Sequence, residues 1–518
     1  MIDTKFKSKI LSLKSEDNYK LKNLLFSKMS LEVYPKSVRE FEGVVFFMAK
    51  ENGKKYLFIQ FDDVNNKTVA QFAGEIIKSE SDGATLKKCE LITKNRKAIQ
   101  SLFPFTNAVT LGVENSFGFG DRIGLANAAH IRSDIKSDFK PILAQQSIRE
   151  LTRTNRIPAE VMDAAVWAVF QEEYDKGFGA DADHLKTTED IDLMVANGFT
   201  MFTFDPSEFV DNEADKISEE KLDEKIKKLH WNGLKSDFDC FSQEYINKEF
   251  KISDNLTIKP DPLSLKRALV KYGNAIAHIK KLYDHLVTKY PDYDSEVEVS
   301  VDETESVTTP FEHFFFVKEL NRLGVKFISL APRFIGDFEK GIDYKGDLNL
   351  FKQEYLKHLA ITKYFGSYKI SLHSGSDKFS VYKVIGSIKE AHTHIKTAGT
   401  SYLEAIKVTA IKDPNLFREI LDYCTKLYEK EKVSYHVSAD IKRIISASDY
   451  KDEELEALFN DDNVRQVLHV TFGRILTDKN EDGSYKFKNR LLDCLIKNEE
   501  TYDKILEKHF DNHLNPFK

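Results

Sequence analysis

Short apolar runs recur along the middle of the chain and alternate with longer stretches of helical periodicity. Eight such runs lie between about residues 106 and 440: NAVTLGVENSFGFGDR, GFGADADHL, FTMFTFDP, EVEVSVDE, VKFISLAP, YKISLHSG, HTHIKT and VSYHVSAD. Amphipathic segments such as IPAEVMDAAVWAVFQEEY and TPFEHFFFVKELNRLG separate most of them. This alternation predicts parallel β/α units. Eight strands buried on both faces predict an α/β protein with a closed (β/α)₈ TIM barrel, and an open doubly wound sheet is the alternative.

Three segments depart from this alternation. Residues 1–105 read as an α+β segment, in which β-rich runs on either side of Asn52-Gly53 predict a hairpin. Residues from about 211 to 292 predict a helical insertion between the third and fourth runs. The barrel domain is therefore expected over residues 106–440, followed by a helical C-terminal extension over residues 441–518.

The composition is that of an ordinary globular protein. Of the 518 residues, 41% are hydrophobic and 31% are charged. A net charge of −7, with Lys and Glu mixed along the chain, argues against a nucleic-acid partner. The four cysteines are far apart, which argues against a zinc ribbon or a disulfide framework. No apolar run has the length of a membrane span and no signal-peptide core is visible, so we expect a cytoplasmic protein without a membrane partner.

Nearly every predicted strand ends in a side chain that can ionise, bind a metal or hold a sugar hydroxyl. In chain order these are Asp121, Arg122, Asp181, Asp183, His184, Lys186, Asp205, Asp302, Glu303, Arg333, His373, Ser374, Lys396, His436 and Ser438. The active site of a barrel of this kind lies at the C-terminal ends of its strands. The concentration of such groups there predicts an enzyme site.

Three strand ends offer metal ligands. His184 follows Asp183 in GADADHLK, Glu303 ends EVEVSVDE, and His373 precedes the small residues Ser374-Gly375-Ser376. Together His184, Glu303 and His373 form a mixed nitrogen and oxygen set that suits a divalent metal ion, Zn²⁺ first, with Mn²⁺, Ni²⁺ or Co²⁺ as alternatives.

Alternatives to this ligand set remain open. Successive side chains of a strand alternate, so only one of Asp302 and Glu303 is expected to face the barrel mouth. His394 and His436 are the reserve ligands. An Asp in a βα loop can also cap the next helix. This alternative holds for Asp181 and for Asp183, and it is weaker for Asp183 because Thr187 and Thr188 supply caps of their own.

Three further patterns carry little functional weight. Gly118-x-Gly120-x-x-x-Gly124 lacks the spacing of a dinucleotide fingerprint. The HFDNH segment places His509 and His513 four residues apart without the glutamate of an H-E-x-x-H motif, so we expect an exposed helix end. His313 is expected to be structural.

The segments FGFGDRIGLANAAH, GFGADADHLKT, EVEVSVDETES, FISLAPRFIGDFEKGIDY, YKISLHSGSDKFSVY and HIKTAGTSYLEA together resemble the tagaturonate epimerase family. The resemblance covers most of residues 106–440 and extends to RQVLHVTFGRIL. Members of the family interconvert D-tagaturonate and D-fructuronate, and related enzymes act on the neutral ketohexoses tagatose and fructose. The resemblance therefore implies an isomerase whose substrate is a sugar acid or a ketohexose.

The implied reaction inverts the carbon β to the ketone, whose hydrogen the carbonyl does not acidify. Retro-aldol cleavage, rotation of the aldehyde fragment and re-addition would achieve this, given a metal as Lewis acid and a base. The Asp-His and His-x-Gly-Ser elements also resemble, over short stretches, those of class II aldolases. We therefore assign the metal to His184, Glu303 and His373, and proton transfer to Asp183, with Glu303 next in line.

The remaining strand-end groups are assigned to the substrate. Arg333 is the first choice for the substrate carboxylate, because arginine forms bidentate contacts with carboxylates; Lys186, Lys378 and Lys396 are the others. The residues expected to line the sugar site are Asp121, Arg122, Ser374 and His436.

Two other classes of function compete with the epimerase. A class II-type aldolase would release its fragments instead of recombining them, and it would use the same side chains. A non-catalytic carbohydrate-binding protein would not need so many ionisable strand ends. Redox epimerisation through a nicotinamide is disfavoured by the missing fingerprint. The oligomeric state is open, and a homo-oligomer is compatible with the sequence.

Overall fold

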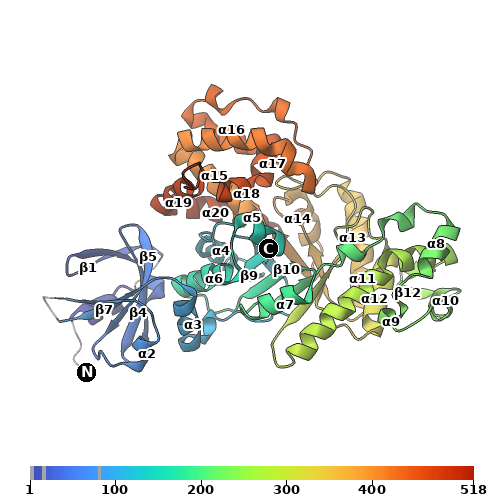
Figure 1. Cartoon of the computed structure of the whole chain (residues 1–518), viewed down its shortest axis with the longest axis horizontal. Coiled ribbons are helices and arrows are strands. Elements are labelled where there is room, and N and C mark those ends of the chain that lie inside the picture. Colours follow the sequence, from blue (N-terminus) through green and yellow to red (C-terminus); the bar gives the residue numbers. More distant parts are fainter. Residues whose placement is uncertain (1–4, 15–18, 80–82) are drawn as a thin grey trace.

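The computed structural model describes residues 5–14, 19–79 and 83–518. Figure 1 shows the barrel at the centre of the molecule, between the N-terminal sheet on one side and the helical insertion on the other. The C-terminal helices cover a third side, at the top of this view. No helix in the described part of the chain is both long enough and apolar enough to cross a membrane.

Eight parallel strands close into a barrel, which confirms the predicted fold class. Their order around the barrel is β10 (Gly179–Leu185), β11 (Met201–Phe204), β14 (Glu296–Ser300), β15 (Ser329–Ala331), β16 (Lys369–Leu372), β17 (Thr393–Thr397), β8 (Ser116–Phe119) and β9 (Lys140–Ser147). The last strand of the barrel pairs with the first, with His394 opposite Ser116 and Thr397 opposite Phe119.

One of the eight predicted strands is wrong, and another was missed. The segment VSYHVSAD is a short 3₁₀ helix, Lys432–Ser434, followed by a loop, and Val433 in it is 84% exposed. The missed strand is β9, KPILAQQS, whose last three residues are polar yet buried. Buried polar side chains interrupt the apolar run by which a buried strand is recognised.

Helices surround the strands and begin at clear capping signals. Thr309 accepts a hydrogen bond from the backbone of Glu312 and Pro310 occupies the first turn, so α12 starts with a capping box. Thr187 and Asp190 form a second such box at α7. The helices around the barrel are α4 (Asn127–Asp134), α5 (Ile148–Thr154), α6 (Pro158–Glu172), α7 (Thr188–Val195), α11 (Pro262–Lys289), α12 (Pro310–Arg322), α13 (Leu348–Tyr364), α14 (Phe379–Gly386) and α15 (Thr400–Lys412).

The insertion is mainly helical, as predicted, but it lies between the fourth and fifth barrel strands, β11 and β14. It also contains a small hairpin, β12 (Phe250–Ser253) and β13 (Leu256–Ile258). Its helical elements before α11 are the 3₁₀ helices Ser207–Phe209 and Asn212–Asp215, then α8 (Glu219–Ile226), α9 (Trp231–Leu234) and α10 (Phe238–Tyr245).

The N-terminal segment is an antiparallel sheet with helices packed on both of its faces. The predicted hairpin is confirmed: Asn52 and Gly53, both with positive φ, form the two-residue turn between β4 (Val44–Glu51) and β5 (Lys54–Phe61). The other elements are α1 (Lys5–Leu11), β1 (Lys22–Phe26), β2 (Met29–Val33), the 3₁₀ helix Pro35–Ser37, β3 (Arg39–Phe41), α2 (Lys67–Ala70), β6 (Glu75–Lys78), β7 (Thr85–Cys89), α3 (Thr93–Leu102) and the 3₁₀ helix Pro104–Thr106.

The C-terminal extension is helical, as predicted, and the last helix packs against α4 and α15. Helix α16 (Pro414–Glu431) precedes the predicted boundary at residue 441. The main elements after that boundary are the 3₁₀ helix Asp452–Asn460, α17 (Asp462–Val470), α18 (Phe472–Thr477), α19 (Lys488–Lys497) and α20 (Glu499–Leu514). Shorter 3₁₀ helices span Ile441–Arg443, Ala447–Asp449 and Asn515–Phe517.

A prediction concerns barrel closure at Gly120. A Cβ there would lie 2.4 Å from the carbonyl oxygen of Thr397, at the β8–β17 seam. We expect Gly120→Ala to lower the melting temperature by about 5 °C or more, because backbone atoms must move apart. Gly273→Ala is the matched control: its Cβ would meet only side-chain atoms of Leu229 and Leu234, and alanine favours the α11 helix. Equal melting temperatures for the two variants would contradict this account of the seam.

Candidate active site

A cavity of about 190 Å³ lies at the C-terminal ends of the barrel strands. Most of the site residues predicted from the sequence line it: Arg122, Asp183, His184, Glu303, Arg333, His373, Ser374, Lys396 and His436. Asp302, Arg149 and Lys340 line it as well. The strand ends therefore meet in one cavity, as expected for a barrel of this kind.

Three side chains converge as a candidate metal site. One ligand atom from each of His184, Asp302 and His373 lies within 4.8 Å of the others. Asp302 Oδ1 is 3.8 Å from His184 Nε2 and 3.3 Å from His373 Nδ1. Nδ1 of His373 is buried and has no hydrogen-bond partner in the described part of the chain. Two imidazole nitrogens and one carboxylate oxygen beside a cavity fit a catalytic divalent metal with open positions.

The carboxylate that joins the two histidines is Asp302, whereas the sequence predicts Glu303. Ser300 donates a hydrogen bond to Asp302, which holds that carboxylate at the mouth of β14. Glu303 is directed to the other side of the cavity, where its Oε1 lies 3.6 Å from Arg149. Of these two adjacent carboxylates, only Asp302 faces the histidines.

Each histidine is oriented by a second carboxylate. Nδ1 of His184 lies 2.8 Å from Asp183, and Nε2 of His373 lies 2.7 Å from Glu298. Each ring therefore keeps its other nitrogen for the candidate metal position. A carboxylate behind a ligating imidazole fixes the tautomer and the orientation of the ring. This arrangement makes Asp183 an orienting group for His184.

Lys396 connects these carboxylates inside the barrel. Its ammonium lies 2.7 Å from Asp181, 2.7 Å from Asp183 and 2.8 Å from Glu298. It also donates a 2.6 Å hydrogen bond to Thr203. The lysine assigned to the substrate carboxylate is thus already bound to three carboxylates of the protein.

The buried charges shift each other's pKa values strongly. Burial would raise the pKa of Asp183, but His184 and Lys396 hold it well below its usual range. Burial would lower the pKa of His373, but Asp302 and Glu298 raise it to about 9. Burial raises the pKa of Asp181 to about 6 despite Lys396. Asp183 therefore stays ionised, and it is a weak proton acceptor.

Three cations face the cavity from its rim: Arg149, Arg333 and Lys340. Lys340 donates a 2.6 Å hydrogen bond to the hydroxyl of Ser374, next to His373. Burial and the neighbouring Arg149 lower the pKa of Lys340. Arg149 pairs with one carboxylate of the cavity, Glu303, at 3.6 Å. The rim therefore has more positive than negative charge and favours an anionic ligand.

Other predicted site residues have structural roles. The carboxylate of Asp121 accepts hydrogen bonds from the backbone N–H groups of Ile123, Gly124 and Ala126 and does not line the cavity. Lys378 is fully buried and donates to three backbone carbonyls, and its burial lowers its pKa to about 7.

Lys186 pairs with Glu208 at 3.1 Å, outside the cavity. Arg122 lines the cavity, but Glu150 holds its guanidinium at 2.8 Å. His436 lies on the rim, with its side chain 58% exposed and 3.1 Å from Asp337. It comes from a loop, because the strand predicted around it does not form.

The remaining histidines are bound elsewhere. His394 lies lower in the barrel, 2.9 Å from the Ser116 hydroxyl, so it does not reach the candidate metal position. His313 is buried against His358 and Tyr368, in agreement with its expected structural role.

The expectation that His509 and His513 lie at an exposed helix end is wrong. Both belong to α20 and pack beside Asp377 in the loop after β16. Nδ1 of His513 is bound to the carbonyl of His509, and Nε2 accepts from the backbone N–H of Asp377. Arg465 pairs with Asp377 at 2.8 Å. With both nitrogens of His513 bonded, this cluster is a structural anchor.

Sequence reasoning missed Glu298, Arg149 and Lys340. Glu298 lies inside the alternating run EVEVS, where a carboxylate on the inward face of a buried strand was a usable signal. Arg149 follows the strand that was not recognised. Lys340 lies in a long loop after β15, for which no periodicity exists.

A prediction follows for Lys396. We expect Lys396→Met to cost about 3–5 kcal/mol of stability, because three buried carboxylates lose their shared cation. The measurement is the melting temperature of the purified protein at neutral pH. Lys363→Met is the control, since Lys363 pairs with Glu390 on the surface, where removal costs about 0–1 kcal/mol. A Lys396 variant as stable as the control would show that the carboxylates do not depend on this ammonium.

Known proteins match this chain over most of its length. The family model described as tagaturonate epimerase matches residues 34–517. A tagaturonate/fructuronate epimerase from Thermotoga maritima is 42% identical over 483 residues, which cover 93% of this chain and 96% of that protein. Crystal structures of the fructuronate-tagaturonate epimerase from Cohnella laeviribosi, one native and one with a glycerol, have TM-scores of 0.88 and 0.87 at 39% identity. Each covers 94% of this chain and 96% of its own. The chain therefore belongs to the tagaturonate epimerase family and is an isomerase that acts on carbohydrates.

Proposed function

We propose that this protein interconverts D-tagaturonate and D-fructuronate at the barrel mouth, with a divalent metal held by His184, Asp302 and His373. The observation that carries the proposal is the convergence of these three ligand atoms within 4.8 Å. They line a cavity whose rim has three cations, in a chain of this family. Zn²⁺ is the first choice for two histidines and one carboxylate, and Mn²⁺, Ni²⁺ or Co²⁺ are alternatives.

The proposed route is retro-aldol cleavage followed by re-addition. The two sugar acids differ at the carbon β to the ketone, so the proton to be removed is that of the β-hydroxyl. A divalent metal would supply Lewis-acid stabilisation of charge on the substrate oxygens. The protein must supply a base for the hydroxyl proton and hold the fragments while one of them rotates.

Glu303 is the proposed proton-transfer group. Its side chain is 37% exposed and faces the cavity beside Arg149. Asp183, the first choice from the sequence, is bound between His184 and Lys396, which hold its pKa well below the usual range of an aspartate. A carboxylate that is already bound on two sides accepts a further proton poorly, so Asp183 orients His184 in this proposal.

Arg149, Arg333 and Lys340 are proposed to receive the substrate carboxylate. All three line the same cavity, and Arg333 has no side-chain ion pair in the described part of the chain. Arginine matches a carboxylate with two parallel hydrogen bonds, which makes Arg333 the leading candidate.

Product analysis tests the proposed activity. We expect the metal-loaded protein to convert tagaturonate into an equilibrium mixture with fructuronate. Three-carbon products without fructuronate would instead make the chain an aldolase. A substrate screen with tagatose and fructose measures how much of the rate depends on the carboxylate.

Variants of the adjacent carboxylates Asp302 and Glu303 separate the two proposed roles. We expect Asp302→Asn to lose bound metal and turnover together, because one of three ligands is weakened. Glu303→Gln should retain the metal and lose turnover by about 10²-fold or more. Metal content by elemental analysis, measured beside activity, separates the two roles. Retained metal in Asp302→Asn together with lost metal in Glu303→Gln would reverse the assignment.

The raised histidine pKa values predict a pH dependence. In metal-free protein, His373 has a pKa of about 9, above an unfolded value of about 6.5. Its protonation therefore stabilises the fold fully below about pH 6.5, and this contribution is lost as the pH rises to 9. A metal competes with that proton, so metal affinity should increase over the same range.

Melting temperatures from pH 6 to pH 9, with and without a chelator, measure both effects. His436→Gln is the control, because its side chain is 58% exposed and lies outside the three ligands. Metal binding that does not change between pH 6 and pH 9 would contradict the proposed ligand set.

A further inference from the structure

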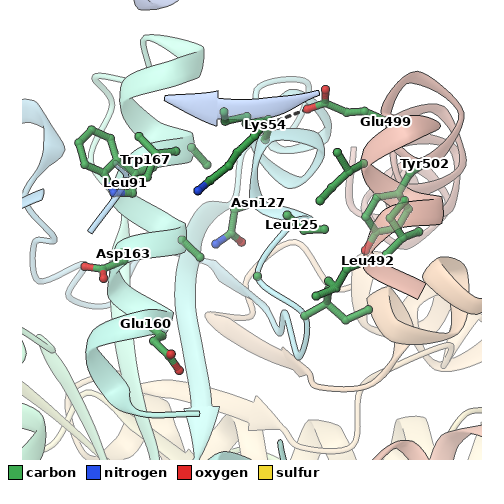
Figure 2. Close-up of a pocket in the computed structure, with 18 of the residues that line it drawn as sticks. Lys54, Leu91, Leu125, Asn127, Glu160, Asp163, Trp167, Leu492, Glu499 and Tyr502 are labelled. Atoms are coloured by element: carbon green, nitrogen blue, oxygen red, sulfur yellow. Dashed lines mark ion pairs between the residues drawn. The ribbon is translucent and has the colours of Figure 1, made fainter. Parts of the chain in front are cut away.

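A second cavity, of about 440 Å³, lies where three parts of the chain meet. It is larger than the candidate active-site cavity of about 190 Å³. The β4–β5 hairpin, helix α6 of the barrel, and helices α19 and α20 of the C-terminal extension form its walls. Figure 2 shows Trp167 and Leu91 on one side of this space and Leu492 and Tyr502 on the opposite side. A pocket of this size is suited to a small organic ligand.

Much of the wall is apolar and only partly covered. Leu91, Leu125, Ala164 and Leu492 line the cavity, and Ile496 beside them is 36% exposed. These side chains come from three different parts of the chain. A ligand with an apolar body would cover them and remove apolar surface from water, at about 25 cal/mol per Å².

Two cations that line this cavity, Arg156 and Lys488, lack an acidic partner. The guanidinium of Arg156 donates to the backbone carbonyls of Asp121 and Glu160, at 2.6 and 3.2 Å. Within residues 5–14, 19–79 and 83–518, neither Arg156 nor Lys488 forms an ion pair with a carboxylate. Cations without a carboxylate partner favour an anionic ligand.

Two of the three carboxylates in the wall are paired with cations. Glu499 pairs with Lys50, and with Lys55 at 2.6 Å. Asp163 pairs with Arg96 and accepts from the Thr93 hydroxyl. The third, Glu160, accepts from the backbone N–H of Ile157. Arg156 and Lys488 together outweigh this one carboxylate, so the complementary ligand group is an anionic acceptor.

We propose that this cavity binds a small carboxylate with an apolar body, at a site separate from the reaction. The carboxylate would accept from Arg156, with Lys488 as the second cation of the wall, and the apolar body would lie against Ala164 and Leu492. A sugar acid fits less well, because its hydroxyls would face apolar side chains without partners.

Arg122 links this site to the active-site cavity. Its side chain is 3% exposed and lines both cavities. Glu150 binds two of its nitrogens, and Nη1 has no partner in the described part of the chain. A molecule in the second cavity would thus be one side chain away from the substrate.

Titration calorimetry on the full, metal-loaded chain tests the proposal with 4-phenylbutyrate as the probe. We expect one saturable site per chain, with the neutral 4-phenylbutanamide binding at least about tenfold more weakly. Asp302→Asn should bind the probe like the wild type, because the site does not use the metal ligands. Absence of saturable binding up to about 10 mM, or competition by galacturonate, would overturn the proposal.

Variants in the cavity wall locate the bound probe. Ala164→Leu should fill the cavity and abolish binding, whereas Ala159→Leu, on the same helix but outside the cavity, should leave it unchanged. Arg156→Gln removes the charge and keeps a hydrogen-bond donor, and it should weaken binding of the carboxylate probe about tenfold. If Ala164→Leu does not fold, Arg156→Gln decides the question. Wild-type affinity in the variants that fold would overturn the assignment.

Discussion

One buried ammonium organises the interior of this barrel. Lys396 binds Asp181, Asp183 and Glu298, and two of these carboxylates orient His184 and His373. Buried charges of one sign are tolerated only when opposite charges lie close to them. The same ion group thus stabilises the barrel and sets the direction of both rings. The geometry of the reaction site and the stability of the core depend on one side chain.

The charged groups of the site fall into two sets, one buried inside the barrel and one at the rim of the cavity. Below the cavity, carboxylates and Lys396 neutralise each other and hold the imidazoles. At the rim, Arg149, Arg333 and Lys340 lack a comparable set of buried partners, so their charge is available to an anionic substrate. This division separates charged groups that hold the histidines from charged groups that line the open part of the cavity. It also explains why residues that look alike in the sequence, such as Lys396 and Lys340, have different roles.

Most of the fold could be predicted, because seven of the barrel strands are apolar runs followed by residues that can ionise or bind a metal. Periodicity failed at β9, since its last residues, Gln145, Gln146 and Ser147, are polar although they are buried. Around Val433, the alternation of apolar and polar residues predicted a strand, but this segment lies on the surface and forms no strand. The choice between Asp302 and Glu303 depends on how the chain turns after β14, and local sequence does not encode that turn. The burial of His509 and His513 is a tertiary effect, created by docking of α20.

The docking of α20 has a consequence for the timing of assembly. His513 accepts a hydrogen bond from the backbone of Asp377, three residues after Ser374 and in the same loop as His373. The helix that holds this loop is translated after all eight barrel strands. A nascent chain can therefore close its barrel on the ribosome while the loop beside His373 still lacks its support. The loop beside His373 therefore gains its hydrogen bond from α20 only after the barrel strands have been synthesised.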